Sequence, residues 1–154
     1  MQTTEFSEKV ALFYYFSFLD ESRAQLASAL TLKKIRQENI TQKKSQQNLT
    51  GRDLVRITNN MSKKLGRDVQ PTSLAFSAGH IVLPKNSNWG PWFEFRKVAN
   101  EKEFSAVLYA RILKISDSEI AEGLNTSLGT VQYRIGRGLK TLGGICVSGR
   151  KNAK

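Results

Sequence analysis

The sequence predicts a mainly α-helical protein made of two small helical units joined by an irregular linker, the C-terminal unit being a helix-turn-helix. Three observations predict this class. Apolar residues recur at helical intervals of three and four in several segments, and capping residues stand where those segments begin. Pro, Gly and Asn break every periodicity in one central stretch. We therefore expect an N-terminal helical unit over residues 1–68, an irregular linker over 69–99, a helix-turn-helix domain over 100–145 and a basic tail over 146–154.

A dense aromatic segment opens the chain and predicts a first helix. Asp20 follows it as the cap of a second helix, so we expect a helix, a tight turn and a helix. We expect the aromatic side chains to be core residues, since such side chains are usually buried. The residues that define these two helices are Phe6, Val10, Phe13, Tyr14, Phe16 and Phe18 in the first, and Leu26, Leu30 and Ile35 in the second.

A third amphipathic helix is predicted to begin at Thr50 and Asp53 and to end at Gly66, a good C-cap residue. Residues 42–48 before it are polar and are expected to form a connection. The apolar face of this helix is formed by Leu54, Ile57, Met61 and Leu65.

Within the expected linker, four aromatic residues lie close together: Trp89, Trp92, Phe93 and Phe95. We expect them to form a hydrophobic latch against one of the helical units, because Trp is usually largely buried. Stacking of Trp89 or Trp92 on a displaced base is the alternative.

The helix-turn-helix domain is predicted to open with an additional helix. Asn100 and Glu103 match a capping box, and an amphipathic pattern continues to residue 112. Ser116 and Glu119 form the next capping box, in which each side chain is expected to bind the other residue's backbone amide. The apolar residues of these two helices are Phe104, Val107, Leu108 and Ile112, then Ile120, Ala121 and Leu124.

A short turn then leads into the last helix. Asn125 suits the turn because Asn tolerates positive φ, and the Ser127 hydroxyl is expected to cap the last helix. The buried side of this helix is predicted to carry Val131, Ile135, Leu139 and Leu142.

The opposite side of the last helix suits an anionic groove, because no acidic residue follows Glu122. Gln can pair with adenine and Arg with guanine in the major groove, each worth about 1–3 kcal/mol of discrimination. Base edges are expected to meet Leu128, Gly129, Gln132 and Tyr133, and phosphates are expected to meet Arg134, Arg137 and Lys140. With Ser127 and Thr130 these form the candidate DNA-binding set. An ordinary helical hairpin with a solvated basic face is the alternative.

The charge of the chain independently favours nucleic acid. Lys and Arg number 24 against 13 Asp and Glu, and residues 33–67 hold ten cations against Glu38 and Asp53. Clustered positive charge attracts phosphates through a salt-dependent, sequence-independent term. A solvated basic face is the alternative interpretation of this block taken alone.

These motifs resemble the C-terminal DNA-binding module of bacterial sigma factors, most closely the extracytoplasmic-function type. Related patterns occur in response regulators with a helix-turn-helix output, but the additional helix before the motif is similar to the sigma arrangement. The resemblance covers about residues 100–142. The residues that carry it are Glu119-Ile120-Ala121, Ser127-Leu128-Gly129-Thr130-Val131, Arg134-Ile135 and Arg137.

The resemblance implies promoter DNA and RNA polymerase core as partners, with an anti-sigma factor as a further one. The first two helices faintly resemble those with which sigma factors grip polymerase. The chain departs from the family in the segment from Trp89 to Phe95, in Gly136 and Gly138 within the last helix, and in Thr126 at a position that is usually apolar. The third helix also lacks the exposed aromatics that would stabilise unpaired bases.

Enzymatic function is not expected. The sequence has no phosphate-binding glycine loop or nucleophile elbow, and the single Cys146 and single His80 offer no metal cluster, so no cofactor or metal is expected. No run of about 18 apolar residues predicts a membrane span, and we expect a cytoplasmic location.

The sequence thus favours a cytoplasmic bacterial transcription protein that resembles a short sigma factor, with a C-terminal module for double-stranded promoter DNA and an N-terminal half that contacts RNA polymerase. Two alternatives stay open. The first is a helix-turn-helix regulator whose N-terminal half dimerises or senses a signal. The second is a protein-interaction factor that binds polymerase or an anti-sigma partner.

Overall fold

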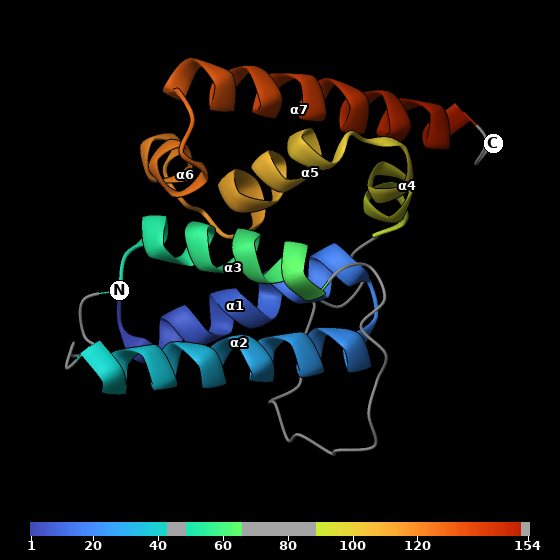
Figure 1. The fold of residues 1–154 in the computed structure, drawn as a ribbon. Coiled ribbons are helices and arrows are strands. Elements are labelled where there is room, and N and C mark those ends of the chain that lie inside the picture. The colour runs from blue at the N-terminus through green and yellow to red at the C-terminus, as the bar shows by residue number, and fades with distance from the viewer. Residues whose placement is uncertain (43–48, 66–88, 152–154) are drawn as a thin grey trace.

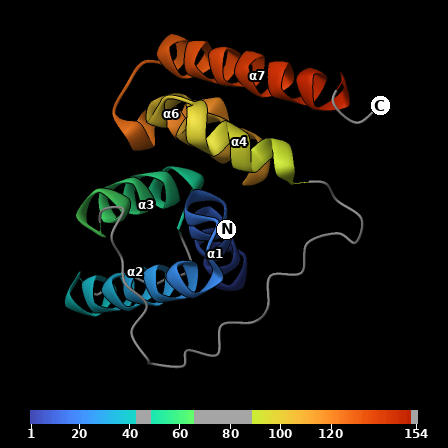
Figure 2. The same ribbon diagram turned by 90° about the vertical axis from the view of Figure 1, so that its right-hand side faces the viewer.

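The computed structural model describes residues 1–42, 49–65 and 89–151, and every regular element in these ranges is a helix. The mainly α-helical class predicted from the sequence is therefore confirmed. Figures 1 and 2 show α7 at one end of the molecule and α2 at the other, with the remaining helices stacked between them. The elements are α1 (Thr3–Phe18), α2 (Glu21–Gln42), α3 (Gly51–Leu65), α4 (Gly90–Val98), α5 (Glu101–Val107), the π-helical turn η2 (Leu108–Ile112), α6 (Asp117–Leu124) and α7 (Leu128–Lys151).

One hydrophobic core joins the two halves of the chain. Its buried residues come from every helix of the described ranges. Phe13 of α1 stacks on Tyr109 of η2 with ring centroids 5.2 Å apart, and the Tyr109 hydroxyl lies 2.9 Å from the Thr58 hydroxyl of α3. The expected division into two separate helical units is not confirmed, because the aromatic N-terminal segment packs against the C-terminal half.

Helix α2 packs on α1 through small residues. The buried side of α2 carries Ala24, Ala27, Ser28 and Thr31, which allow a close approach, and the Thr31 hydroxyl lies 2.8 Å from the Tyr14 hydroxyl. Asp20 caps α2 as predicted, since its carboxylate accepts a hydrogen bond from the Arg23 amide at 2.8 Å. The helical spacing predicted Leu30 on the apolar face, but Leu30 is exposed because the smaller residues hold the contact.

The structure differs from the linker predicted over residues 69–99, because residues 90–98 form helix α4. Pro91 lies in the first turn of α4, where a missing amide costs little, so the Gly-Pro pair begins a helix here and does not break one. Trp92 and Phe95 are buried and Phe93 is exposed. Residues 69–88 of the expected linker, with His80, and the expected C-cap Gly66 lie outside the described residues.

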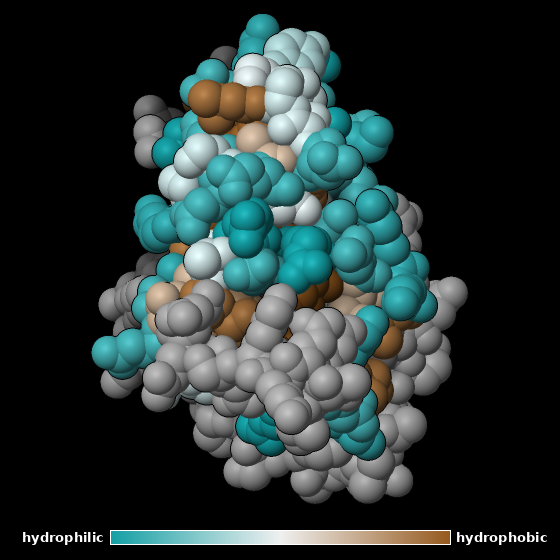
Figure 3. Space-filling view, turned by 60° about the vertical axis from the view of Figure 1, so that its left-hand side comes forward, coloured by the Kyte–Doolittle hydropathy of each residue, from teal (hydrophilic) through white to brown (hydrophobic). Residues whose placement is uncertain are grey.

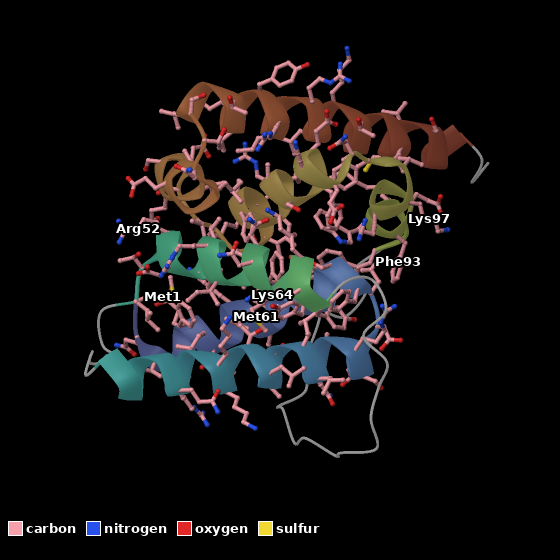
Figure 4. The ribbon with its side chains drawn as sticks, viewed as in Figure 1. Met1, Arg52, Met61, Lys64, Phe93 and Lys97 are labelled. Carbon is pink, nitrogen blue, oxygen red and sulfur yellow. The ribbon has the colours of Figure 1, made fainter. Side chains whose placement is uncertain are left out.

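Two side chains of α4 donate hydrogen bonds to backbone carbonyls at the C-terminal end of α1. The Trp92 indole donates a hydrogen bond to the Phe16 carbonyl at 3.2 Å, and Arg96 Nε donates to the Ser17 carbonyl at 2.9 Å. These carbonyls lie in the last turn of α1, where helices leave acceptors without an internal partner. The aromatic latch expected around Trp92 therefore exists, and it joins α4 to the first helix. Phe93 and Lys97 lie on the outer side of α4, as Figure 4 shows.

Helix α7 is longer than the sequence predicted. It continues through Lys151, so the segment predicted as a tail from residue 146 is largely helical. None of the helices in the described ranges combines the length and the apolar character that crossing a membrane requires.

Candidate nucleic-acid interface

Helix α5, which precedes α6 and α7, begins after Asn100 as predicted, but Glu103 does not take its predicted part in the cap. The Asn100 side chain accepts a hydrogen bond from the Lys102 amide at 2.9 Å and caps α5. Glu103, expected to complete the capping box, instead forms an ion pair with Arg137 of α7, with 3.6 Å between Oε1 and Nε. Phe104, Val107 and Leu108 are buried as predicted.

The N-terminal cap of α6 includes a side chain, that of Glu119, which also contacts α3. The Ser116 hydroxyl accepts from the Glu119 amide at 3.4 Å and donates to Glu119 Oε2 at 2.7 Å. Glu119 Oε1 accepts from the Gly51 amide of α3 at 3.0 Å. One carboxylate thus joins the starts of two helices, a contact that the local capping pattern did not predict.

The ionisation of Glu119 reflects these contacts. The Ser116 hydroxyl is the largest cause that lowers the pKa of this carboxyl below its ordinary value. Partial burial opposes the shift, while the amides of Gly51 and Ser116 and the charge of Lys9 support it. The carboxylate form of Glu119 is therefore the form that fits the structure.

Helix α6 also crosses α3 at very short range. A Cβ added at Gly123 would lie 2.7 Å from Val55 Cβ and 2.8 Å from the Arg52 carbonyl oxygen. Ile120 and Ala121 are buried on the same helix. Near this crossing, Arg52 Nη1 lies 3.7 Å from Glu122 Oε2, and Figure 4 shows Arg52 pointing outward from the start of α3.

In the connection between α6 and α7, Asn125 and Ser127 take the turn and capping roles predicted for them. Asn125 adopts the left-handed conformation with φ of 51°, and the Thr126 amide donates to the Ala121 carbonyl at 2.9 Å, which closes α6. The Ser127 hydroxyl then accepts from the Thr130 amide at 3.1 Å and caps α7. In Figure 1 the view runs along α6 and across α7, so the two helices cross.

Helix α7 has one buried side and one exposed side. Val131, Ile135 and Gly138 are buried against the rest of the molecule. A Cβ at Gly138 would lie 2.6 Å from Val107 Cγ2 and 3.1 Å from the Glu103 carbonyl oxygen, so a glycine is required where α7 crosses α5. Leu139 and Leu142, predicted to be buried, are partly exposed at the edge of this side.

The predicted DNA-contacting residues lie mostly on the exposed side of α7. Leu128 is 45% exposed, Tyr133 is 64% exposed, and the Arg137 side chain is 60% exposed. Gly129, Gln132 and Lys140 are also exposed, whereas Arg134 is half-buried. Ser127 and Thr130 do not extend this set, because their hydroxyls lie 2.8 Å apart and belong to the cap. We call Leu128, Gly129, Gln132, Tyr133, Arg137 and Lys140 the outer face of α7.

The outer face has open space and positive charge. Nothing lies within 4 Å of a Cβ built at Gly129 or Gly136, so the α7 backbone can be approached closely from this side. No acidic residue follows Glu122 in the sequence. In the upper part of Figure 3, at the level of α7, the surface is largely hydrophilic with one small apolar patch.

Among the residues that the structure describes, no group of three His, Cys, Asp or Glu side chains is placed to hold a metal ion. Comparison of the chain with protein-family models, with curated proteins and with solved structures found no match in any of the three.

Proposed function

We propose that the chain binds double-stranded DNA through the outer face of α7, as part of a bacterial transcription protein. The observation that carries this proposal is the division of α7 into a buried apolar side and an exposed basic side. Val131 and Ile135 fix the helix to the core, while Gln132, Tyr133 and Arg137 project away from it. A helix held in this way can enter the major groove without unfolding any part of the core.

The charges along α7 support a phosphate-bearing partner. Arg134, Arg137 and Lys140 follow one another at intervals of three, and α7 contains no acid that would repel DNA. Glu103 offsets part of the charge of Arg137, but the Arg137 side chain stays 60% exposed and can still reach a phosphate. The polar residues near the start of α7 then meet base edges, and the cations beyond them hold the backbone.

The resemblance of this module to sigma factors makes promoter DNA the proposed target and RNA polymerase core the proposed partner of the N-terminal half. An anti-sigma factor would be a further partner of the same surface. A plain DNA-binding regulator is the second candidate, and the shared core favours it. Because Glu119 and Gly123 lock α6 onto α3, the N-terminal helices are placed to act as a brace for the DNA-reading module.

The first experiment measures the affinity of the full chain for duplex DNA over a range of salt concentrations by fluorescence anisotropy. Each phosphate contact contributes about 0.9 to the slope of log K against log salt. Arg137→Ala combined with Lys140→Ala should weaken binding and reduce that slope by about 1.8. The matched control is Lys33→Ala with Arg36→Ala, which removes the same charge from exposed positions of α2, at the opposite end of the molecule.

Equal losses in the α7 and α2 variants would contradict the proposal, because a sequence-blind attraction to net charge would then explain binding. A second experiment separates the two candidates. A sigma factor should co-purify with core polymerase in stoichiometric amounts and direct transcripts from specific promoters. A plain regulator should bind its DNA site without either result.

A further inference from the structure

An apolar side chain stands at the start of the outer face. Leu128 is the first residue of α7 and is 45% exposed. It precedes the buried Val131 and Ile135 by three and seven positions, so it continues their apolar stripe to the first turn of α7, where the stripe becomes exposed. A single exposed leucine is common on protein surfaces, so its exposure alone is weak evidence for a binding site. The position of Leu128 next to Gln132 is stronger evidence.

Leu128 and Gln132 are neighbours on the helix surface. Residues at i and i+4 lie about 5–6 Å apart between Cβ atoms, which is close to one or two base-pair steps of about 3.4 Å. Gln132 is exposed, and within the described part of the chain its side-chain amide makes no hydrogen bond. That amide can offer both a donor and an acceptor to one partner.

The backbone between these two side chains permits close contact. Gly129 follows Leu128, and nothing lies within 4 Å of where its Cβ would be. A larger side chain there would hold a ligand away from the short Leu128 side chain. The glycine therefore adds no side chain of its own beside Leu128 and Gln132 in this turn of the helix.

We propose that Leu128 and Gln132 together read adenine–thymine base pairs in the major groove, an inference that rests on the proposed DNA binding by α7. Gln132 binds the N6 and N7 atoms of adenine with two hydrogen bonds. Leu128 packs on the C5 methyl group of thymine in the same or the adjoining base pair. The surface thus recognises a duplex in which adenine and thymine occupy the base pairs nearest the start of α7.

The same pair disfavours guanine and cytosine. The major-groove edge of a G·C pair presents two acceptors and one donor and has no methyl group. Guanine offers two acceptors, O6 and N7, where adenine offers a donor and an acceptor, so the Gln132 amide cannot repeat its paired hydrogen bonds there. Leu128 meets no methyl group on a G·C pair, so its contribution to specificity is its attraction to the thymine methyl.

The test begins with selection of binding sites from a randomised duplex pool by the full-length chain. We expect the enriched sites to share A·T pairs. Each thymine of an enriched site is then replaced by deoxyuridine, which differs only in lacking the C5 methyl group. One replacement should weaken binding by about fourfold, the equivalent of about 0.8 kcal/mol for one buried carbon group. This arm uses the unmodified protein and does not depend on how any variant folds.

Variants then assign the effect to residues. Leu128→Ala should weaken binding to the thymine site by a similar factor and should no longer distinguish thymine from deoxyuridine. Gln132→Ala should relax the preference for adenine at one position. Val147→Ala is the matched control, since Val147 is another exposed apolar residue of α7, 57% exposed, near the opposite end of the helix. It should retain both the affinity and the discrimination of the wild type.

The inference would be overturned by enriched sites made only of G·C pairs, by no effect of deoxyuridine at any position, or by full discrimination retained by Leu128→Ala. In each of these cases duplex binding itself would still be observed, so the proposed function would survive. Failure of the chain to bind or enrich any duplex would instead overturn the proposed function, and this inference with it. Equal weakening of all sequences by Leu128→Ala would assign the residue to general contact and would also refute the proposed base-reading role.

Discussion

The Glu119 carboxylate accepts a hydrogen bond from the Gly51 backbone amide at 3.0 Å, across 68 positions of the sequence. The same side chain binds the Ser116 hydroxyl at the start of α6. Because Gly51 begins α3, this contact joins the start of α6 to the start of α3. The orientation of α6, and through it that of α7, thus depends on a contact made far from the proposed DNA surface.

Glu119→Gln is expected to lower the free energy of unfolding at neutral pH by about 1–2 kcal/mol, because charge-assisted hydrogen bonds to Gly51 and Ser116 become neutral ones. Urea unfolding followed by circular dichroism measures this change. The pKa of Glu119 is lowered in the folded state, chiefly by the Ser116 hydroxyl, so the stabilisation is present above the ordinary value of 4.5 and is lost as pH falls through the folded pKa. The difference between the two proteins should therefore shrink in acid. A difference that stays constant from neutral pH to pH 3 would show that ionisation of Glu119 is not its source.

Two glycines of α7 should respond oppositely to the same substitution. Gly136→Ala should stabilise the protein by about 1 kcal/mol, because nothing lies near the added methyl group and alanine favours the helix. Gly138→Ala should destabilise it, because the methyl group would collide with the buried Val107 side chain and approach the Glu103 carbonyl. Thermal unfolding of the pair provides an internal comparison. Equal stabilisation by both substitutions would mean that α7 does not cross α5 at Gly138.

Trp92 should be one of the most sensitive positions of the core. Trp92→Ala is expected to cost about 3–5 kcal/mol, because the indole is buried between Phe16 and Phe104. Trp92→Phe should cost less, since it keeps an aromatic ring but leaves the Phe16 carbonyl without its donor. Phe93→Ala is the neighbouring control and should change stability by about 0.5 kcal/mol or less, because Phe93 is exposed. Similar costs at positions 92 and 93 would rule out α4 as a latch on α1.

Tyr14 should make stability depend on alkaline pH. Burial raises the pKa of Tyr14 to about 12 from its ordinary 10.0, so the neutral phenol stabilises the fold below pH 10 and that contribution is lost as pH rises toward 12. Tyr14→Phe keeps the ring and removes the titrating hydroxyl, and it should therefore lose less stability than the wild type between pH 9 and pH 11. At neutral pH its cost should be about 1 kcal/mol, the hydrogen bond to Thr31. An identical alkaline decline in both proteins, measured by urea unfolding, would exclude Tyr14 as a source.

Local signals in the sequence predicted the helix starts of the site well. Ser116, Asn125 and Ser127 act within a few residues of themselves, and each lies where its capping or turn chemistry placed it. The same reasoning predicted which side of α7 faces outward, because Val131 and Ile135 repeat at helical spacing. These features depend on neighbours in the sequence, so no tertiary information was needed.

The errors have a common physical origin in contacts between distant segments. Gly90 and Pro91 indicate a break when only local propensity is considered, yet packing of Trp92 on α1 stabilises a helix that begins there. The capping box predicts that Glu103 binds the nearby Asn100 backbone amide, but Glu103 forms an ion pair with Arg137 on another helix. The division into two units, which the structure does not confirm, was expected because nothing in the local pattern reveals that Phe13 meets Tyr109.

Photo-cross-linking from a single position of α7 tests the proposed DNA surface most directly. A photoreactive phenylalanine analogue replaces Tyr133, which is 64% exposed on the outer face, or Leu30, which is 39% exposed on α2 at the opposite end of the molecule. The full-length proteins are irradiated with the enriched duplex and with excess unlabelled competitor. The proposal predicts a covalent adduct from position 133 that the competitor abolishes, and no adduct from position 30. Equal adducts from both positions, or none from position 133 while the duplex remains bound, would contradict it.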